Sequence, residues 1–116
     1  MHVLLPNSGV RTNGREFNPY LYADTGLRAF LKALTRMGAD KSRLQARLAG
    51  GGDLVPLSNL LNIGRKNSDE AVGIIRAEGI PILGSSLGGS APRSMSLRIK
   101  DGVVTVRLIG RGQEIL

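Results

Sequence analysis

Apolar residues recur every three or four positions beyond residue 24, and this period predicts a helix over residues 24–38. Arg28, Lys32 and Arg36 fall on the opposite face, so the apolar side is expected to pack into the core. Asp24 is placed to cap the helix, and Gly38 is placed to end it in a left-handed conformation. The predicted core face consists of Leu27, Phe30, Leu31, Leu34 and Met37.

A second helix is predicted up to Gly79, with Asn67 as its cap and Glu70 in capping-box position. Its apolar face is narrower, and Gly73 weakens it because glycine disfavours helix interiors. Residues 54–62 contain Pro56, which breaks a regular element, so we expect a turn or short helix there that covers the core.

Strands are predicted from alternation and from turn residues. Residues 43–49 alternate, with Arg47 among the side chains that should face water, and they run into the flexible loop Gly50-Gly51-Gly52-Asp53. Residues 80–83 form a short apolar strand, and the Gly- and Ser-rich residues 84–92 read as a loop. Residues 94–100 and 103–108 flank Asp101-Gly102, a pair typical of two-residue hairpins, and the tail beyond Gly110 is expected to fray.

The first six residues, Met1-His2-Val3-Leu4-Leu5-Pro6, read as a strand that enters a loop and carry the only histidine. An interior strand at the start of a chain has nothing upstream to pair with, which predicts a truncated domain. Residues 7–21 form a long polar connection without a period of their own. The order of elements implies a mixed sheet with packed helices, either α/β or α+β, in a single domain over residues 1–116.

Composition narrows the chemistry. Cysteine is absent, so the 116 residues hold neither a disulfide nor a thiol nucleophile, and one histidine with nine scattered carboxylates gives no metal-ligand pattern and no cofactor motif. The net charge of +7 comes from basic residues spread along the chain, with only four aromatics beside them, which favours acidic protein partners over nucleic acid. Neither a membrane span nor a secretory signal is present, so we expect a cytoplasmic protein.

Several local patterns together resemble the CheD family of chemoreceptor glutamine deamidases. The first pattern is His2-Val3-Leu4-Leu5-Pro6. Together the patterns span nearly all 116 residues, and their order and spacing are specific. The others are Tyr22-Ala23-Asp24, Gly38-Ala39, Arg47-Leu48-Ala49-Gly50-Gly51, Ile63-Gly64-Arg65-Lys66-Asn67, Glu78-Gly79-Ile80-Pro81, Leu87-Gly88-Gly89 with Arg93, and Val103-Val104-Thr105-Val106-Arg107.

The resemblance implies a layered α/β/β/α sandwich of the deamidating-toxin type, missing its first strands, and hydrolysis of glutamine side chains on chemoreceptors. The family uses a cysteine, a histidine and a threonine, and His2 is the residue that matches the histidine. The cysteine and threonine precede it in the family, so this polypeptide alone is predicted to be inactive. Chemoreceptors are the implied substrates, and the phosphatase CheC is an implied partner.

Substrate contacts are predicted at the two glycine turns, because glycines allow a substrate backbone to come close. The residues are Gly50, Gly51, Gly64, Arg65 and Asn67, although a structural role for Asn67 is favoured over a functional one. Ala49 and Ser86 depart from the family, which commonly has an aromatic and an acidic residue at these positions.

Two alternatives from other functional classes stay open. One is a CheD-like adaptor that has lost catalysis and binds a phosphatase or receptor. The other is a basic nucleic-acid-binding module, which predicts steep salt-dependent binding to unrelated duplexes. On spacing alone, His2 would be a solvated residue near a chain end, and it is the match of the whole chain that favours a catalytic role.

Overall fold

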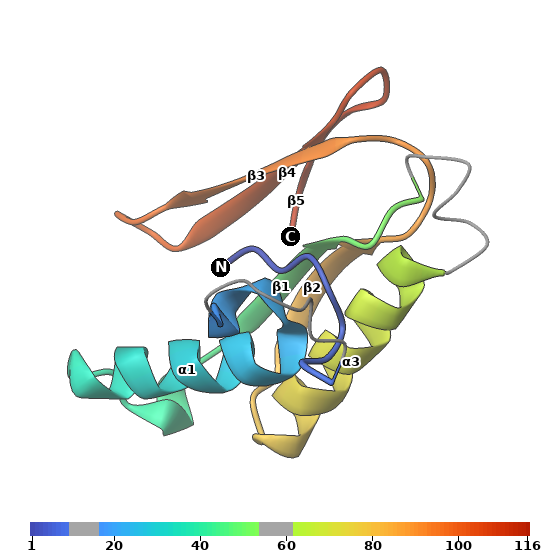
Figure 1. The fold of residues 1–116 in the computed structure, drawn as a ribbon. Helices are drawn as coiled ribbons and strands as arrows, with labels where there is room; N and C mark the ends of the chain where they lie inside the picture. Colours follow the sequence, from blue (N-terminus) through green and yellow to red (C-terminus); the bar gives the residue numbers. More distant parts are fainter. Residues whose placement is uncertain (10–16, 54–61) are drawn as a thin grey trace.

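The computed structural model describes residues 1–9, 17–53 and 62–116. These residues form two helices and two sheets (Figure 1), so the predicted mixed α+β class is confirmed. The prediction for residues 54–62 lies almost wholly outside the described part of the chain. The elements are η1 (Pro19–Leu21), α1 (Ala23–Arg36), η2 (Lys41–Arg43), β1 (Ala46–Gly50), α3 (Ile63–Ala77), β2 (Ile82–Leu87), β3 (Arg93–Arg98), β4 (Val103–Leu108) and β5 (Gly112–Ile115).

The strands divide into a parallel pair, β1-β2, and an antiparallel sheet in the order β3-β4-β5. The two helices lie on one side of the parallel pair, and the antiparallel sheet lies on the other (Figure 1). The sequence between β1 and β2 contains α3, as expected because parallel strands need a crossover connection.

The two sheets meet where the C-terminal residue crosses the parallel pair. The Arg47 Nε–H donates to the Leu116 carbonyl at 2.8 Å, so this side chain faces the second sheet and not water as predicted. A Cβ added to Gly84 would lie 2.9 Å from the Leu116 Cβ. Gly84 belongs to β2 because it pairs with Arg47 of β1, so the predicted loop at residues 84–92 is wrong over its first four positions. A backbone lacking a side chain there allows the sheets to approach.

The buried core is small. Helix α1 contributes Ala23 and Gly26, whereas Phe30 is 36% exposed and Met37 is 85% exposed, so two positions of the predicted core stripe are wrong. Small residues are buried because η1 packs directly on the helix: a Cβ at Gly26 would lie 3.2 Å from the Pro19 carbonyl oxygen. Within the part of the chain that the structure describes, the buried apolar residues are Tyr22, Ala23, Ala71, Ile74, Ile75, Ile80, Val104 and Val106.

Both helices end where predicted and begin earlier. Gly38 and Gly79 adopt φ of +94° and +72°, which fits their predicted role after the last turn. Helix α3 starts at Ile63 and its N-cap is Asn62, at φ 48°, so the prediction that Asn67 caps this helix is wrong. The left-handed backbone of Asn62 lets the chain turn into the helix five residues before the predicted cap, which is more than one helical turn.

The N-terminal strand prediction is also wrong, because within the described residues 1–6 only Leu5 pairs, through a single parallel bridge to Tyr22. In the connection predicted to lack structure, residues 10–16 lie outside the description. Its end forms the η1 turn, which the Asn18 side chain caps by accepting from the Tyr20 N–H at 3.0 Å.

Two boundaries near other turns differ from prediction. Strand β1 starts at Ala46 and not at residue 43, because Asp40 caps the preceding η2 turn and accepts from the Ser42 N–H at 2.9 Å. Residues 99–102 connect β3 to β4, so the hairpin is confirmed but its loop is longer than two residues. Arg98 closes that loop through its 2.8 Å ion pair with Asp101.

The C-terminal tail is ordered, contrary to prediction. Strand β5 pairs with β4, and the Leu116 N–H donates to the Val104 carbonyl at 2.9 Å. Pairing satisfies backbone groups that a frayed tail would leave to water. None of the helices in the described residues has the length and apolar character needed to cross a bilayer.

Candidate functional site

Two glycine loops meet at the carboxyl ends of β1 and β2. Because these strands are parallel, the loops that follow them leave the same edge of the sheet. The Gly88 N–H donates to the Gly50 carbonyl at 2.9 Å, and the Asp53 N–H donates to the Gly89 carbonyl at 2.9 Å. In open α/β sheets this edge is the usual place for a ligand, so it is the natural candidate site.

The first turn of α3 packs onto this edge. A Cβ at Gly64 would lie 2.5 Å from the Gly51 carbonyl oxygen, and a Cβ at Gly51 would lie 1.9 Å from the Ser68 Oγ. Gly51 also has a positive φ of 61°. The sequence predicted Gly50, Gly51 and Gly64 as substrate contacts. The structure packs Gly51 and Gly64 backbone on backbone, whereas a Cβ at Gly50 would meet nothing within 4 Å among the described residues.

Arg93 fastens the two loops. Its guanidinium donates through Nη2 to the Gly88 carbonyl and, at 3.4 Å, through Nη1 to the Gly50 carbonyl. Sequence reasoning noted Arg93 only as part of the family resemblance and gave it no role. The available signal was its position as the first residue of a strand after a loop rich in glycine and serine.

The segment that carries His2 is anchored two residues further on. The Leu4 and Leu5 N–H groups both donate to the Leu21 carbonyl, at 2.9 and 3.0 Å. The Asn67 Nδ2 donates to the Leu4 carbonyl at 3.0 Å and ties the segment to α3. The structural role favoured for Asn67 is therefore seen, although it holds the N-terminal segment and does not cap the helix.

His2 itself is exposed. Among the described residues, no hydrogen bond or ion pair joins its ring to the glycine loops. Arg65 also points into solvent, with 80% of its side chain exposed and a 3.6 Å ion pair to the equally exposed Asp69. The structure thus joins the three glycines and connects Asn67 to the His2 segment, while Arg65 stays outside this arrangement.

Asp24 fixes the loop that follows the His2 segment. Its carboxylate accepts from the Ser8 N–H at 3.0 Å, from the Ser8 hydroxyl at 2.9 Å and from the Thr25 N–H at 2.8 Å. Partial burial opposes ionisation, but these hydrogen bonds outweigh it and hold the pKa of Asp24 below its ordinary value of 3.8. Its predicted cap position is taken by Tyr22, so Asp24 acts as an anchor in the first turn.

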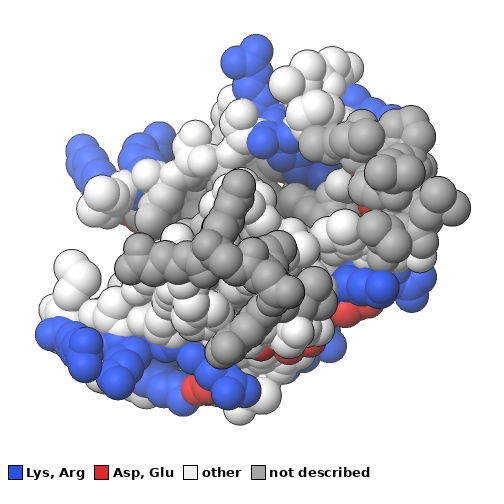
Figure 2. Space-filling model, viewed as in Figure 1, with Lys and Arg blue, Asp and Glu red and all other residues white. Residues whose placement is uncertain are grey.

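Basic side chains are not confined to the candidate site. Figure 2 shows Lys and Arg side chains along α1, around the antiparallel sheet and beside α3, with few acidic ones. Over residues 1–9, 17–53 and 62–116, the His, Asp and Glu side chains form no group of three or more that could hold a metal. The recognisable features of the site are its packed glycines and the histidine segment.

Comparison with known proteins connects these features to one family. The family described as "CheD chemotactic sensory transduction" matches residues 4–108, beginning two residues after His2. A Methanococcus maripaludis protein named "Probable chemoreceptor glutamine deamidase CheD" is 41% identical over 107 residues, which cover 91% of this chain and 68% of that protein.

Two further relatives are similar over almost the whole chain. The "Chemoreceptor glutamine deamidase CheD" of Thermotoga maritima is 35% identical over 114 residues, covering 98% of this chain and 69% of the relative. A "Probable chemoreceptor glutamine deamidase CheD" of Desulfitobacterium hafniense is 34% identical over 118 residues, covering 99% and 72%. With a family match that spans most of its length and relatives this similar, the chain belongs to the CheD family.

Proposed function

We propose that these 116 residues carry the histidine of a cytoplasmic protein-glutamine deamidase whose substrates are chemoreceptors. The observation that carries the proposal is the family match over residues 4–108, together with relatives named as chemoreceptor glutamine deamidases. The names of the relatives give their substrates as chemoreceptors, and we propose the same substrates for this chain.

The proposed reaction uses His2 with a thiol that lies outside the given residues, since these contain no cysteine. The imidazole takes the proton of the thiol, and the thiolate attacks the carbonyl carbon of the glutamine amide. The imidazolium then gives its proton to the departing nitrogen, so ammonia leaves and a thioester remains. Water attacks the thioester with the imidazole as base, which releases glutamate and restores the thiol.

Two properties of the N-terminal segment support this role. Its backbone is anchored at Leu4 and Leu5, which limits where the ring can move, and the ring itself is exposed and therefore open to a partner group. The relatives are also longer than this chain, which spans 68% to 72% of those compared above. The proposal accordingly includes further strands that complete an α/β/β/α sandwich and bring the thiol and a threonine to His2.

The glycine loops at the carboxyl ends of β1 and β2, called the glycine edge, are proposed to support substrate binding indirectly. Packing of Gly51 against Gly64 fixes the first turn of α3, and that helix holds the His2 segment through Asn67. A CheC-type phosphatase remains a proposed partner on the strength of the family resemblance alone.

The test compares four proteins on a purified cytoplasmic fragment of a chemoreceptor, with mass spectrometry to find glutamines converted to glutamate. The full-length product of the gene is expected to convert specific glutamines, and its His2→Ala variant is expected to lose this activity. The 116-residue chain alone is expected to release no ammonia, and Glu114→Gln, at an exposed position on β5, is the matched control.

Two results would contradict the proposal. Ammonia release by the 116-residue chain would show that no external thiol is needed. Unchanged conversion by the His2→Ala variant would remove the imidazole from the reaction. A full-length product that binds the receptor fragment and never converts it would favour the adaptor instead.

A further inference from the structure

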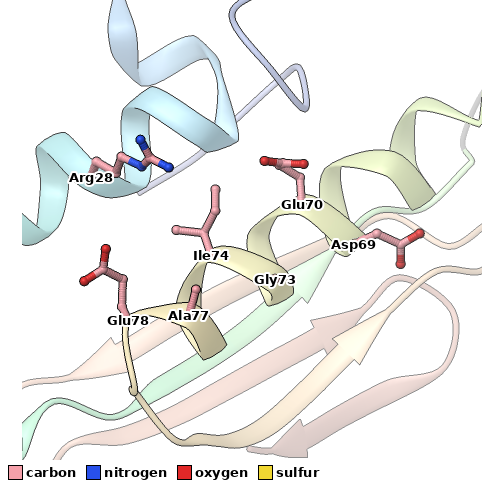
Figure 3. A pocket seen from close by; sticks show the side chains of 7 residues that line it. All are labelled: Arg28, Asp69, Glu70, Gly73, Ile74, Ala77 and Glu78. Atoms are coloured by element: carbon pink, nitrogen blue, oxygen red, sulfur yellow. The ribbon is translucent and has the colours of Figure 1, made fainter.

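A groove of about 270 Å³ runs between α1 and α3, on a different part of α3 from the glycine edge. Figure 3 shows Arg28 reaching from α1, while Glu70, Ile74 and Glu78 extend from α3 on the side that faces it. The middle of the groove is formed by Gly73 and Ala77, one helical turn apart, beside the buried Ile74. The groove therefore has a floor of small and apolar residues between charged rims.

Packing among the described residues does not require a glycine at position 73. It does require the other two helical glycines, because a Cβ at Gly26 or Gly64 would lie 3.2 or 2.5 Å from a backbone oxygen. A Cβ at Gly73 would meet no described residue within 4 Å. Glycine in a helix interior costs about 1 kcal/mol relative to alanine. Since no contact within the described residues explains this cost, the space above Gly73 is the feature to be explained.

The α3 rim of the groove is acidic in a basic protein. Asp69, Glu70 and Glu78 make up three of the nine carboxylates in a chain of net charge +7. Asp69 and Glu78 form ion pairs whose side chains are 73% and 33% exposed, with partners on the surface. Such exposed pairs contribute little and can exchange partners. Among the described residues, no ion pair engages Glu70.

We propose that the α1–α3 groove is a docking site for a helix of the protein substrate. The docked helix would place small apolar side chains on Gly73 and Ala77 and direct a lysine or arginine toward Glu70. The inference rests on the proposed function, because that function supplies a protein substrate with a surface around the reacting glutamine.

The shape of the groove favours a helix as occupant. A row of small residues one turn apart lets the ridge of another helix enter between α1 and α3. Its position favours the substrate, because α3 also holds the His2 segment through Asn67, six residues before Gly73. At 1.5 Å rise per residue, Asn67 and Gly73 lie about 9 Å apart along the helix axis. This separation is within the breadth of one standard protein interface.

The first experiment fills the groove without disturbing the helix. Gly73→Leu places a large side chain in the open space, and Gly73→Ala adds only one methyl group. Both residues favour helix formation over glycine, so both variants should keep their fold by circular dichroism and thermal melting. Calorimetric binding of the purified chemoreceptor cytoplasmic fragment should weaken at least tenfold for Gly73→Leu and less than threefold for Gly73→Ala.

The second experiment tests the rim charge. Glu70→Lys should weaken binding of the same receptor fragment by about fivefold at low salt, and this loss should shrink as salt screens the charges. Glu114→Lys makes the same charge change at an exposed position of β5 and should leave binding within twofold.

Each remaining outcome decides the inference separately from the function. Equal affinity of wild type and Gly73→Leu for the receptor fragment would contradict docking in the groove, even if the full-length product still deamidates the receptor. Absence of binding by the wild type would also contradict docking in the groove. Loss of deamidation in His2→Ala would still support the proposed function in that case. If light scattering shows a dimer of wild type that Gly73→Leu abolishes, the groove binds a second copy and the assignment to substrate is wrong.

Discussion

The first turn and the middle of α3 each contain a glycine, and the two positions differ completely in their surroundings. Gly64 faces the carbonyl of Gly51 at a distance that excludes any side chain, whereas Gly73 faces open space. The same residue type thus marks a tight backbone contact at one position and a vacant groove at the other. A glycine in a helical sequence is informative only once the space around its missing Cβ is known.

Substituting Gly64 should give the largest effect. In Gly64→Ala the new methyl group would lie 2.5 Å from the Gly51 carbonyl oxygen, and neither backbone can move freely. We expect a net loss of about 2 kcal/mol in the free energy of unfolding: roughly 3 from overpacking, less about 1 regained in helix propensity. Urea unfolding measures this, and a variant as stable as wild type would contradict the packed edge.

Removing the Arg93 guanidinium should have a smaller effect at the same edge. Arg93→Met keeps the apolar stem but removes the side-chain donor to the Gly88 carbonyl and one of two donors to the Gly50 carbonyl, which keeps its bond from the Gly88 N–H. Charged hydrogen bonds of this kind contribute about 1.5 kcal/mol or more, so we expect a loss of that size. Arg107→Met, at an exposed position of β4, is the control and should change stability by less than about 0.5 kcal/mol. Equal effects of the two variants would contradict a stabilising role for the hydrogen bonds from Arg93 to the two loops.

The Asp24 anchor should make part of the stability depend on pH. Its folded pKa is lowered, so its contribution is present above the ordinary value of 3.8 and is lost as the pH falls through the folded value. Asp24→Asn should therefore be about 1 kcal/mol less stable than wild type at pH 7. The difference should shrink in urea unfolding as the pH is lowered through 3.8, and a constant difference would exclude the ionised carboxylate as its cause.

Gly73→Ala should produce the smallest effect and one of opposite sign. The methyl group meets none of the described residues within 4 Å, so only the gain in helix propensity is expected. We expect an increase of about 0.5–1 kcal/mol in the free energy of unfolding. A decrease would mean that the groove is already filled by the protein itself, and would remove the contrast between the two glycines.

Local patterns predicted the elements whose stability is local. The helical period of residues 24–38 and the turn pair Asp101-Gly102 placed α1 and the β3-β4 hairpin close to their observed positions. Prediction failed where residues far away in the sequence determine the extent of a strand. Strand β2 continues through Gly84 because β1 pairs with it, and β5 forms because β4 offers it hydrogen bonds. Nothing near either segment in the sequence carries that information.

The candidate site follows the same division. The sequence singled out Gly50, Gly51 and Gly64, yet only the fold shows that Gly51 and Gly64 pack against one another. The hydrogen bond from Asn67 to Leu4 spans 63 positions, and the one from Arg93 to Gly50 spans 43. Contacts this far apart in the chain leave no periodic signal, so their geometry became visible only in the structure.

The proposed reaction requires the His2 imidazole to activate a thiol outside these 116 residues. The rate of iodoacetamide alkylation of the full-length gene product, followed against pH, measures that activation directly. We predict a thiol that reacts fully at neutral pH in wild type, and a profile in His2→Ala that shifts to the ordinary thiol range near pH 8.5 (about the unperturbed cysteine pKa). Superimposable profiles for the two proteins would contradict the proposed activation.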